Sequence, residues 1–371
     1  MKPYNHGMKI KFDYIDSDEQ LIAFSRDIAS AKWLAVDTEF MRERTYYAQL
    51  ALIQVASENS FALIDTPALS SLAPLREVFS REGCLKIMHS ASQDMEVLGQ
   101  SLGVMPAPLF DTQIAASFLG EADQIAYAAI VKQRIGVELD KDQTRTNWLQ
   151  RPLSPAQVGY AEADVLYLYE LYDQLVAELQ ANDRQEWAKA ESQSLGEKMR
   201  QASEPELAWQ RLKSLSRLSP GQQHIAKALA DWRERRAQQR DLPREWILSK
   251  QALIGIAKAQ PESMRELGDI EGLTPKVAQR IGKQLLKVVA EMPADDYQSL
   301  VPADLSAEQR GQAKRIMAHL RSIGEMQNIA PSLIANRSSI ERLVAGERDL
   351  PLLKGWRAEV AGDELLGMLD A

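Results

Sequence analysis

The sequence predicts an α/β domain with a mixed sheet, followed by two small all-α bundles. Three observations support this architecture. Strand-like and helix-like segments alternate up to about residue 200, only helical periodicity follows, and the charge of the chain changes sign along its length. With 371 residues, of which 45% are hydrophobic, the chain is long enough to bury more than one core. We therefore expect domains at 1–200, 205–292 and 296–371.

The first half of the chain contains short apolar runs that are typical of strands. Three of them follow one another through short connections before helices begin to alternate with strands, which predicts a mixed rather than a purely parallel sheet. The expected strands are 33–39, 49–56, 60–65 and 84–88. The expected helices are 18–30, 70–80, 91–101, 112–119 and 155–180. Asp111 directly precedes one of these helices and is expected to be its N-cap.

The second half of the chain shows helical periodicity interrupted by Pro and Gly. The expected helices are 206–217, 222–239, 249–259, 262–268, 274–290, 306–323, 331–335 and 338–345. A long helix rich in Arg and Ala, followed by a short helix, occurs both in 222–268 and in 306–345. This similar spacing predicts that the second bundle repeats the first.

Charge is distributed unevenly between these parts. The net charge is −8 overall, −10 over residues 1–200, +7 over 205–290 and −4 over 291–371. An acidic domain joined to a basic module is expected when one part binds metal ions and another binds phosphate groups. A surface charge bias without function would give the same numbers.

The compartment follows from two further features of the sequence. Cys84 is the single cysteine, so an intrachain disulfide is excluded, and it lies at the start of an apolar strand where we expect it to be buried. No apolar run approaches the ~20 residues that span a bilayer, and the N-terminus lacks the apolar region of a signal peptide. We expect a cytoplasmic monomer without a membrane partner.

Two acidic side chains interrupt the most apolar strand. In WLAVDTEF, Asp37 and Glu39 follow four core-like residues, and side chains two positions apart in a strand share one face. Two like charges in such a place cost free energy unless a cation joins them. The strand therefore predicts a cation site.

Further acids are positioned to complete that site. Asp94 begins a helix after an expected strand, and Tyr160 and Asp164 share one face of a later helix. Mg²⁺ and Mn²⁺ favour oxygen ligands. Four carboxylates with a tyrosine would therefore fit a site for two such divalent ions. Each element alone has an ordinary interpretation as exposed surface, and Tyr169 with Asp173 repeats the same helical spacing nearby.

These motifs carry a resemblance to a known family. D-T-E-F at 37–40, H-x4-D-x-E-V at 89–97 and Y-x3-D at 160–164 resemble the three motifs of DEDD-superfamily exonucleases of the tyrosine subclass. The intervening segments are similar to bacterial ribonuclease D: RTYYAQLALIQ (44–54), LFDTQIAA (109–116) and RTNWLQRPLSPAQ (145–157). Residues 206–290 resemble an HRDC module, and 296–371 resemble a divergent second copy.

The resemblance implies an RNase H-like catalytic domain and a 3′→5′ exoribonuclease that releases nucleoside 5′-monophosphates. It implies that Asp37 bridges two metal ions, that Glu39 and Asp164 complete the site of the attacking water, and that Asp94 supports the second ion. Tyr160 would orient that water. The implied partners are tRNA precursors and other RNAs with single-stranded 3′ ends.

Residues that contact the substrate are less strongly indicated. Thr38 and Phe40 flank the acids and could hold the terminal nucleotide, and His89 is a candidate for positioning rather than catalysis. Arg145, Trp148 and Arg151 lie in a loop before the tyrosine helix and could meet the RNA backbone. Packing of Trp148 onto the core is an equal alternative. A cationic helix offers either an RNA surface or a solvated face: Lys227, Trp232, Arg233, Arg235, Arg236 and Arg240.

Two other functions remain open from the sequence. The same five motif residues would serve a DNA 3′→5′ exonuclease, which equal hydrolysis of deoxy substrates would reveal. The chain could also be a helicase-associated nucleic-acid-binding protein with an inactive nuclease fold. It contains no G-x4-G-K-[ST] motif and so is not itself a P-loop helicase.

Overall fold

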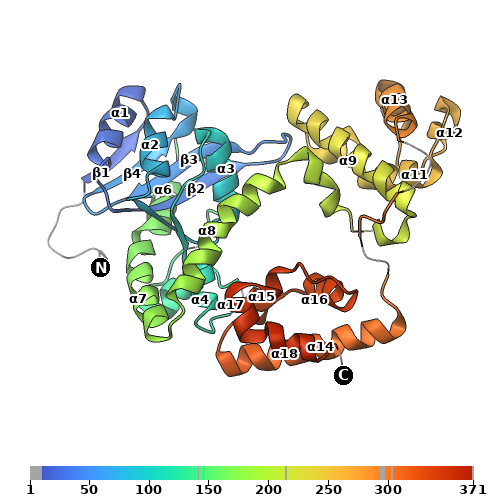
Figure 1. The fold of residues 1–371 in the computed structure, drawn as a ribbon. Helices are drawn as coiled ribbons and strands as arrows, with labels where there is room; N and C mark the ends of the chain where they lie inside the picture. Colours follow the sequence, from blue (N-terminus) through green and yellow to red (C-terminus); the bar gives the residue numbers. More distant parts are fainter. Residues whose placement is uncertain are drawn as a thin grey trace.

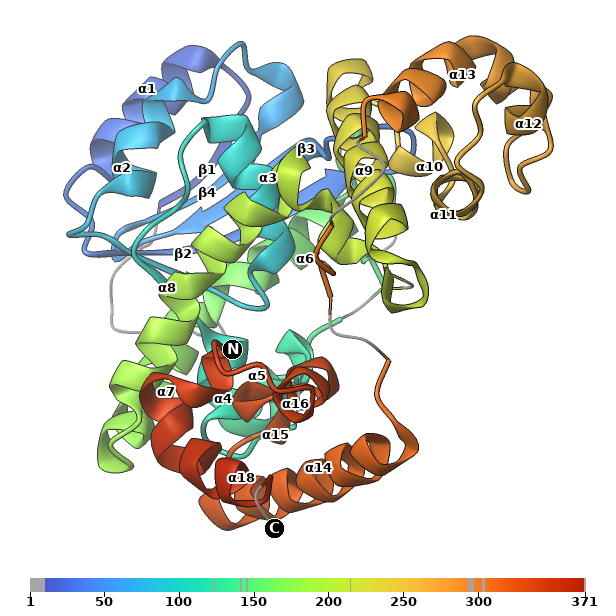
Figure 2. The same ribbon diagram turned by 45° about the vertical axis from the view of Figure 1, so that its right-hand side comes forward.

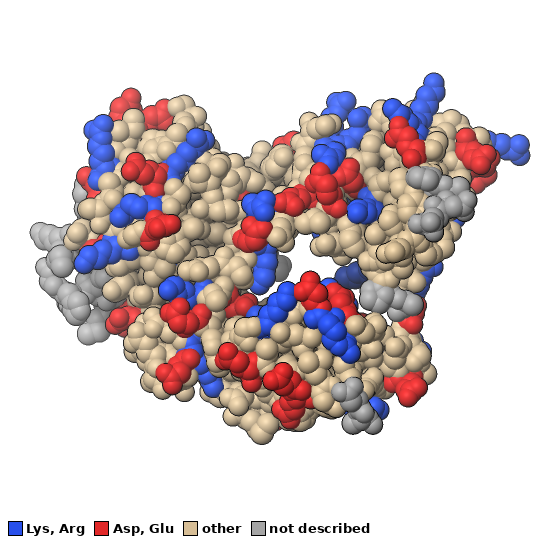
Figure 3. All heavy atoms as spheres, in the orientation of Figure 1, with Lys and Arg blue, Asp and Glu red and all other residues tan. Residues whose placement is uncertain are grey.

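The computed structural model describes residues 11–122, 124–140, 142–144, 146–213, 215–292, 297–301 and 304–369. Figures 1 and 2 show an α/β domain and two helical modules arranged around a central gap. In the space-filling view, an opening remains between the two modules, and acidic and basic side chains are mixed over this face (Figure 3). Within the described ranges, no helix is long and apolar enough to cross a membrane.

The α/β domain is built on a six-stranded mixed sheet, as the sequence predicts. Its order is β1-β4-β3-β2-β5-β6; β3 is antiparallel to both of its neighbours, and the other pairs are parallel. The strands are β1 (Lys11–Ile15), β2 (Trp33–Met41), β3 (Gln49–Ala56), β4 (Ser60–Asp65), β5 (Leu85–Met88) and β6 (Leu109–Asp111). The predictions missed β1 and β6, which are the two short edge strands.

Helices cover both faces of the sheet. They are α1 (Asp18–Asp27), α2 (Arg76–Ser80), α3 (Ser92–Leu102), α4 (Thr112–Ser117), α5 (Tyr127–Ile135), α6 (Pro155–Leu166), α7 (Leu168–Ala181) and α8 (Gln185–Ala202). One face packs against α1, α2 and α3, with Cys84 fully buried there as expected, and the other packs against α6. Side chains from β2 can therefore meet groups from two different helices.

Several helix predictions need correction. The expected helix 155–180 divides at Tyr167 into α6 and α7, and the expected helix 70–80 is helical only in its second half. The predictions missed α5 and α8. The prediction of Asp111 as an N-cap is confirmed: its carboxylate accepts hydrogen bonds from the amides of Gln113 and Ile114.

The first helical module (205–292) contains five α-helices after a 3₁₀ segment, Pro205–Arg211, where the sequence predicts an α-helix. They are α9 (Pro220–Arg240), α10 (Arg244–Ile247), α11 (Lys250–Ala259), α12 (Met264–Gly268) and α13 (Pro275–Ala290). The second helical module (304–369) contains α14 (Ala307–Gln327), α15 (Pro331–Ile334), α16 (Arg337–Val344), α17 (Gly355–Arg357) and α18 (Asp363–Gly367).

The first helices of the two modules have capping residues at matching positions. Both α9 and α14 have 21 residues, and each starts with a serine capping box and ends at a residue in the left-handed conformation. One offset of 87 residues relates three pairs of capping residues: Ser219 and Ser306, Asp241 and Asn328, Ser249 and Asn336. Their first three α-helices therefore start in register without an insertion.

The modules attach to the α/β domain in different ways. The first receives Tyr46, from the β2–β3 hairpin, into its own core. The second shares a continuous core with α4, α7 and α8, in which Trp356 stacks on Trp187 and packs edge-on against Phe118. The hairpin links the first module to the strand that carries Asp37 and Glu39.

Candidate active site

Strand β2 places two carboxylates at the end of a buried run. Its first four residues are buried, and Asp37 and Glu39 follow on one face, half-buried. Their cross-strand neighbours on β3 are Gln54 and Leu52, and the pairing shifts register directly after Glu39. Such a bulge changes the direction of a strand and often lies beside a functional site.

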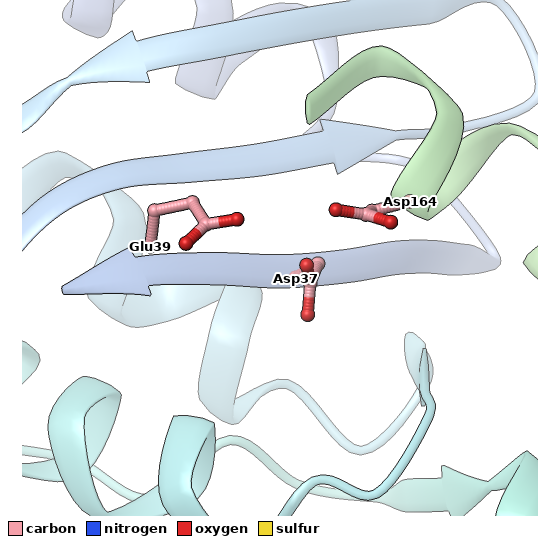
Figure 4. A group of neighbouring side chains, drawn as sticks. All are labelled: Asp37, Glu39 and Asp164. Carbon is pink, nitrogen blue, oxygen red and sulfur yellow. The ribbon is translucent and has the colours of Figure 1, made fainter. Parts of the chain in front are cut away.

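Helix α6 brings the third carboxylate to the same place. A capping box at Ser154 and a proline in the first turn fix where the helix starts. Ala161 and Val165 are buried against the sheet, so the residue before each of them, Tyr160 and Asp164, lies on the adjoining flank of the helix. Figure 4 shows the Asp164 carboxylate facing those of β2. An oxygen from each of the three acids lies within 4.8 Å of the others.

Asp94 lies beside this group of three rather than within it. It is in the first turn of α3, is 8% exposed, and accepts a hydrogen bond from the Thr38 hydroxyl. Arg42, directly after β2, and Glu96 on α3 form an ion pair at 2.9 Å, which further ties the strand to the helix. The position of Asp94 relative to β2 is thus fixed by two side-chain contacts.

The four acids form no ion pair with a basic side chain of the described residues. Burial, together with repulsion from Asp164, raises the pKa of Glu39 to about 9. Burial and the charge of Asp94 raise the pKa of Asp164 to about 7, burial raises the pKa of Asp94 to about 6, and the pKa of Asp37 is well above its usual range for the same reasons. Without a cation, protons must neutralise part of this site.

The donor set fits divalent ions. Three carboxylates offer only oxygen ligands, which Mg²⁺ and Mn²⁺ prefer over nitrogen or sulfur. Oxygens bound to one Mg²⁺ at about 2.1 Å lie at most about 4 Å apart, so small side-chain rotations would complete the shell. A bound cation would also remove the repulsion that raises these pKa values.

Tyr160 borders the acids as a protonated phenol. Its ring lies against Trp148, with centroids 6.0 Å apart, and its hydroxyl is 3.4 Å from that of Thr144. Burial, followed by the charge of Asp164, raises the pKa of Tyr160 to about 12. The hydroxyl can therefore donate or accept a hydrogen bond at neutral pH, but it is no strong base by itself.

The structure corrects two of the substrate hypotheses. Trp148 is 2% exposed and packs beneath α6, so the packing alternative holds and no face is left to stack on a base. Arg151 forms an ion pair with Asp65 at 2.6 Å and donates to the carbonyl of Ala51 at 2.8 Å. Both side chains fix the loop before α6 onto the sheet.

The remaining substrate candidates lie in mixed positions. The ring nitrogens of His89 are used by the Thr112 hydroxyl at 2.8 Å and the Ile125 carbonyl at 2.9 Å, and burial lowers the pKa of this imidazole. His89 therefore has a structural contact at each nitrogen. Phe40 is partly exposed next to the acids. Arg145 lies outside the described residues.

The sequence predictions missed Gln54. It faces Asp37 across the β2–β3 pair, is fully buried, and neither amide atom has a hydrogen-bond partner among the described residues. Residues directly opposite in an antiparallel pair have their Cβ atoms about 5 Å apart and share a face. A single amide within the apolar run LALIQVA was the available signal.

Comparisons with known proteins agree with this geometry. A family model for 3′-5′ exonucleases matches residues 12–180, and one for the HRDC domain matches 222–289. Ribonuclease D of Sphingobium indicum is 35% identical, over 96% of this chain and 94% of that protein. Ribonuclease D of a Shewanella species is 34% identical, over 95% and 93%. The crystal structure of Escherichia coli RNase D, described as an exoribonuclease involved in structured RNA processing, superposes with a TM-score of 0.87 at 31% identity, covering 97% of this chain and 99% of that one.

The fold, the acidic site and the matched models define a 3′→5′ exonuclease with an HRDC domain. The relatives are similar over nearly their whole length, so the similarity extends well beyond the catalytic domain. The chain belongs to the ribonuclease D family, and its activity is that of a 3′→5′ exoribonuclease.

Proposed function

We propose that the chain hydrolyses RNA from its 3′ end with two divalent metal ions and releases nucleoside 5′-monophosphates. The observation that carries this proposal is a set of carboxylates that pair with no basic side chain of the described residues: the half-buried Asp37, Glu39 and Asp164, with the buried Asp94 beside them. A structural cluster of acids would be paired with Lys or Arg, because unpaired buried charge is costly.

Each acid has a part in holding the ions. Asp37, Glu39 and Asp164 are grouped closely enough to hold one ion together, and Asp94, fixed by Thr38, would help to hold the second. The ions, when bound, supply positive charge to the phosphate and acidity to water, which is the chemistry that hydrolysis requires. Gln54, the buried amide directly opposite Asp37 on β3, lies on the same face of the sheet as this ligand.

We propose that the chain belongs to the tyrosine subclass of DEDD exonucleases, which the position of Tyr160 supports. Its hydroxyl keeps its proton at neutral pH and lies on the same helix flank as Asp164, with which it shares a hydrogen bond. We propose that it orients the attacking water by hydrogen bonding. General acid–base groups positioned in this way contribute about 10²- to 10⁴-fold to rate.

The substrate is the single-stranded 3′ end of RNA. Phe40 is partly exposed directly after the acids and can stack on the terminal base, a contact that any base can make. By its family the chain trims structured RNAs, including tRNA precursors and other small RNAs. The DNA alternative requires the site to ignore the 2′-hydroxyl, which is the group that distinguishes RNA from DNA.

We further propose three domains: an exonuclease domain at 1–200, an HRDC domain at 205–292, and a divergent second HRDC-like domain at 296–371. The constant offset of 87 residues between capping residues supports the second copy. Apolar positions also match: Leu229 with Ile316, Leu253 with Ile340, and Ile256 with Leu343 are buried in both modules.

A labelled-substrate experiment tests this function. Matched single-stranded RNA and DNA with a 5′ label are incubated with Mg²⁺, Mn²⁺ or EDTA, and an Asp37→Asn variant serves as the inactive control. We expect a ladder that shortens from the 3′ end of RNA with metal and stops in EDTA. An equal ladder on DNA would favour the DNA exonuclease, and binding of RNA without any ladder would favour the inactive nuclease fold.

A further inference from the structure

The internal repeat allows one face of α9 to be compared with the same face of α14. On α9 this stripe runs through Gln223, Lys227, Ala230, Glu234 and Gln238, a spacing that keeps residues on one side of a helix. The stripe at the same positions of α14, 87 residues later, runs through Arg310, Lys314, Met317, Arg321 and Glu325. The two copies thus present different chemistry at equivalent places.

In the first module both ends of this stripe are covered by the protein itself, while Lys227 between them is half-buried and lines a hollow. Glu234 is fully buried and receives the Tyr46 hydroxyl at 2.6 Å and the Arg211 guanidinium at 2.8 Å. Gln223 is 2% exposed. Its side chain donates a hydrogen bond to the Leu218 carbonyl at 3.0 Å and accepts one from the backbone amide of Leu300. The segments 205–213 and 215–218 and the β2–β3 hairpin therefore occupy both ends of this side of α9.

In the second module the same stripe borders an open groove. Two adjoining hollows of 800 and 310 Å³ lie along it, and they share Met317, Arg321 and Arg337 as lining residues. Ala313 and Met317 line the smaller hollow, and the larger one extends to the turn at Gly120 in the α/β domain. We call this continuous surface the α14 groove.

The α14 groove is lined by four basic side chains, Arg310, Lys314, Arg321 and Arg337, and by three acidic ones, Glu121, Glu325 and Glu341, so basic side chains are in small excess. Arg310, Lys314 and Arg321 are exposed and form no ion pair with the described residues, whereas Arg337 pairs with Glu341 at 2.7 Å. Arg321 stands where the first module buries Glu234, so the sign of the charge is reversed. In the first module, the segment that covers α9 places Arg211 against the acid Glu234. By the same logic, a partner that covers α14 has to place an anion against Arg321.

We propose that the α14 groove binds the phosphodiester backbone of the RNA substrate upstream of the cleaved 3′ end. This inference rests on the proposed function. Arg310 and Arg321 are eleven residues apart, which is about 16 Å along a helix and enough to contact several phosphates. Contacts from Arg and Lys to phosphates hold a strand without reading its sequence, as a trimming enzyme requires. The groove also adjoins the α/β domain, so a strand that lies in it stays next to the catalytic half.

The test removes the three unpaired cations together in the full chain, as Arg310→Gln, Lys314→Gln and Arg321→Gln. The matched control removes three exposed cations that do not line the groove, as Arg26→Gln, Lys276→Gln and Arg315→Gln, which gives the same net charge. Affinity for a 20-nucleotide RNA is measured in EDTA by fluorescence anisotropy at several salt concentrations. Turnover of an RNA dinucleotide is measured with metal in parallel.

We expect the groove variant to bind the long RNA about tenfold more weakly and the slope of log affinity against log salt to fall by about 2, since each phosphate contact on a single strand contributes about 0.7. Dinucleotide turnover should not change, and the control variant should bind like the parent chain.

An equal loss of RNA affinity in both variants, or no loss in either, would overturn the proposal. Loss of poly-glutamate binding with unchanged RNA affinity would assign the groove to an acidic protein segment. A failure of the proposed function would instead abolish cleavage by the parent chain without affecting this binding comparison.

Discussion

Two groups of buried carboxylates in this protein are neutralised in opposite ways. Burial raises the pKa of Glu234 on α9, but hydrogen bonds from Arg244 and Tyr46 outweigh it, so the net pKa lies below its usual value. On β2 and α6, burial and mutual repulsion raise the pKa of Glu39 and Asp164, and no described basic side chain compensates them.

The difference separates a structural acid from a functional one. The chain itself supplies the cations that pair with Glu234. This acid therefore joins the first module to the β2–β3 hairpin without any bound ion. The acids of the active site are held together at a cost that the rest of the fold must offset. Such a cost persists in a native protein where an external group, here a pair of divalent ions, relieves it.

The largest effect is expected from Asp37→Asn, which removes one charge from the uncompensated group and keeps the side-chain shape. Exonuclease turnover should fall by at least about 10³-fold, because a central metal ligand is lost. The free energy of unfolding in EDTA should stay the same or rise, because like-charge repulsion is relieved. Turnover is measured on labelled RNA, and stability by urea denaturation.

A matched control for this prediction is Asp173→Asn. Asp173 follows Tyr169 at the same helical spacing as Asp164 follows Tyr160, but it lies outside the group of acids. Its amide variant should keep full turnover. Substantial activity in Asp37→Asn, or a clear loss of its stability in EDTA, would place Asp37 in the structural class with Glu234.

A smaller loss is expected from Tyr160→Phe, which leaves all four acids in place. If the hydroxyl only orients water, turnover should fall by about 10²-fold while KM and the affinity for Mn²⁺ remain close to those of the parent chain. Tyr169→Phe, in which the ring remains stacked on Trp33, is the matched control and should have full activity. A Tyr160→Phe variant that loses Mn²⁺ affinity would instead show that the phenol helps to hold the metal.

Glu234→Gln tests the compensated group. Loss of the charge leaves Arg244 and Arg211 without their shared carboxylate and weakens the contact with Tyr46. We expect the protein to be destabilised by about 2 kcal/mol, since breaking a buried pair leaves charged groups unsatisfied. Urea denaturation measures this effect, and Mn²⁺ should not restore it. Dinucleotide turnover at 20 °C should be retained if the active site does not depend on this junction.

Local patterns in the sequence explain why the active site could be predicted. Asp37 and Glu39 interrupt an apolar strand, and Tyr160 and Asp164 are one helical turn apart, so each pair can be recognised within a few residues. The structure brings Asp37, Glu39 and Asp164 together as that interpretation requires. The roles of these residues stay predictions until the variants are measured.

Contacts between distant segments could not be predicted in this way. Glu234 meets partners from positions 46, 211 and 244. Arg151 turns inward because Asp65 and the Ala51 carbonyl of β3 lie beneath it, and Trp148 is buried in the core under α6. The run of Arg on α9 left an RNA surface and a solvated face equally open, and neither holds for the whole run, because Arg233 is 4% exposed and Arg235 pairs with two acids. Charge counts along a sequence do not show which side chains are already paired.

The smallest expected effect is a difference in pH dependence between the two groups. Acids whose folded pKa is raised, such as Asp164 at about 7 and Glu39 at about 9, destabilise the fold progressively as pH rises from their unfolded values near 4 through those folded values. Glu234, with a lowered pKa, has the opposite sign: it contributes stability above its unfolded value, and this contribution is lost only as pH falls through its folded pKa. In EDTA we therefore expect the free energy of unfolding to fall between pH 5 and pH 9, and to fall more steeply below pH 7, where both acids still lose their protons on unfolding. Mn²⁺ should flatten the profile, and so should Asp164→Asn.

Glu234→Gln should shift the whole profile down without changing its slope in this range. A profile in EDTA that is already flat for the parent chain would mean that the acids of β2 and α6 are compensated from within, and the contrast between the two groups would fail.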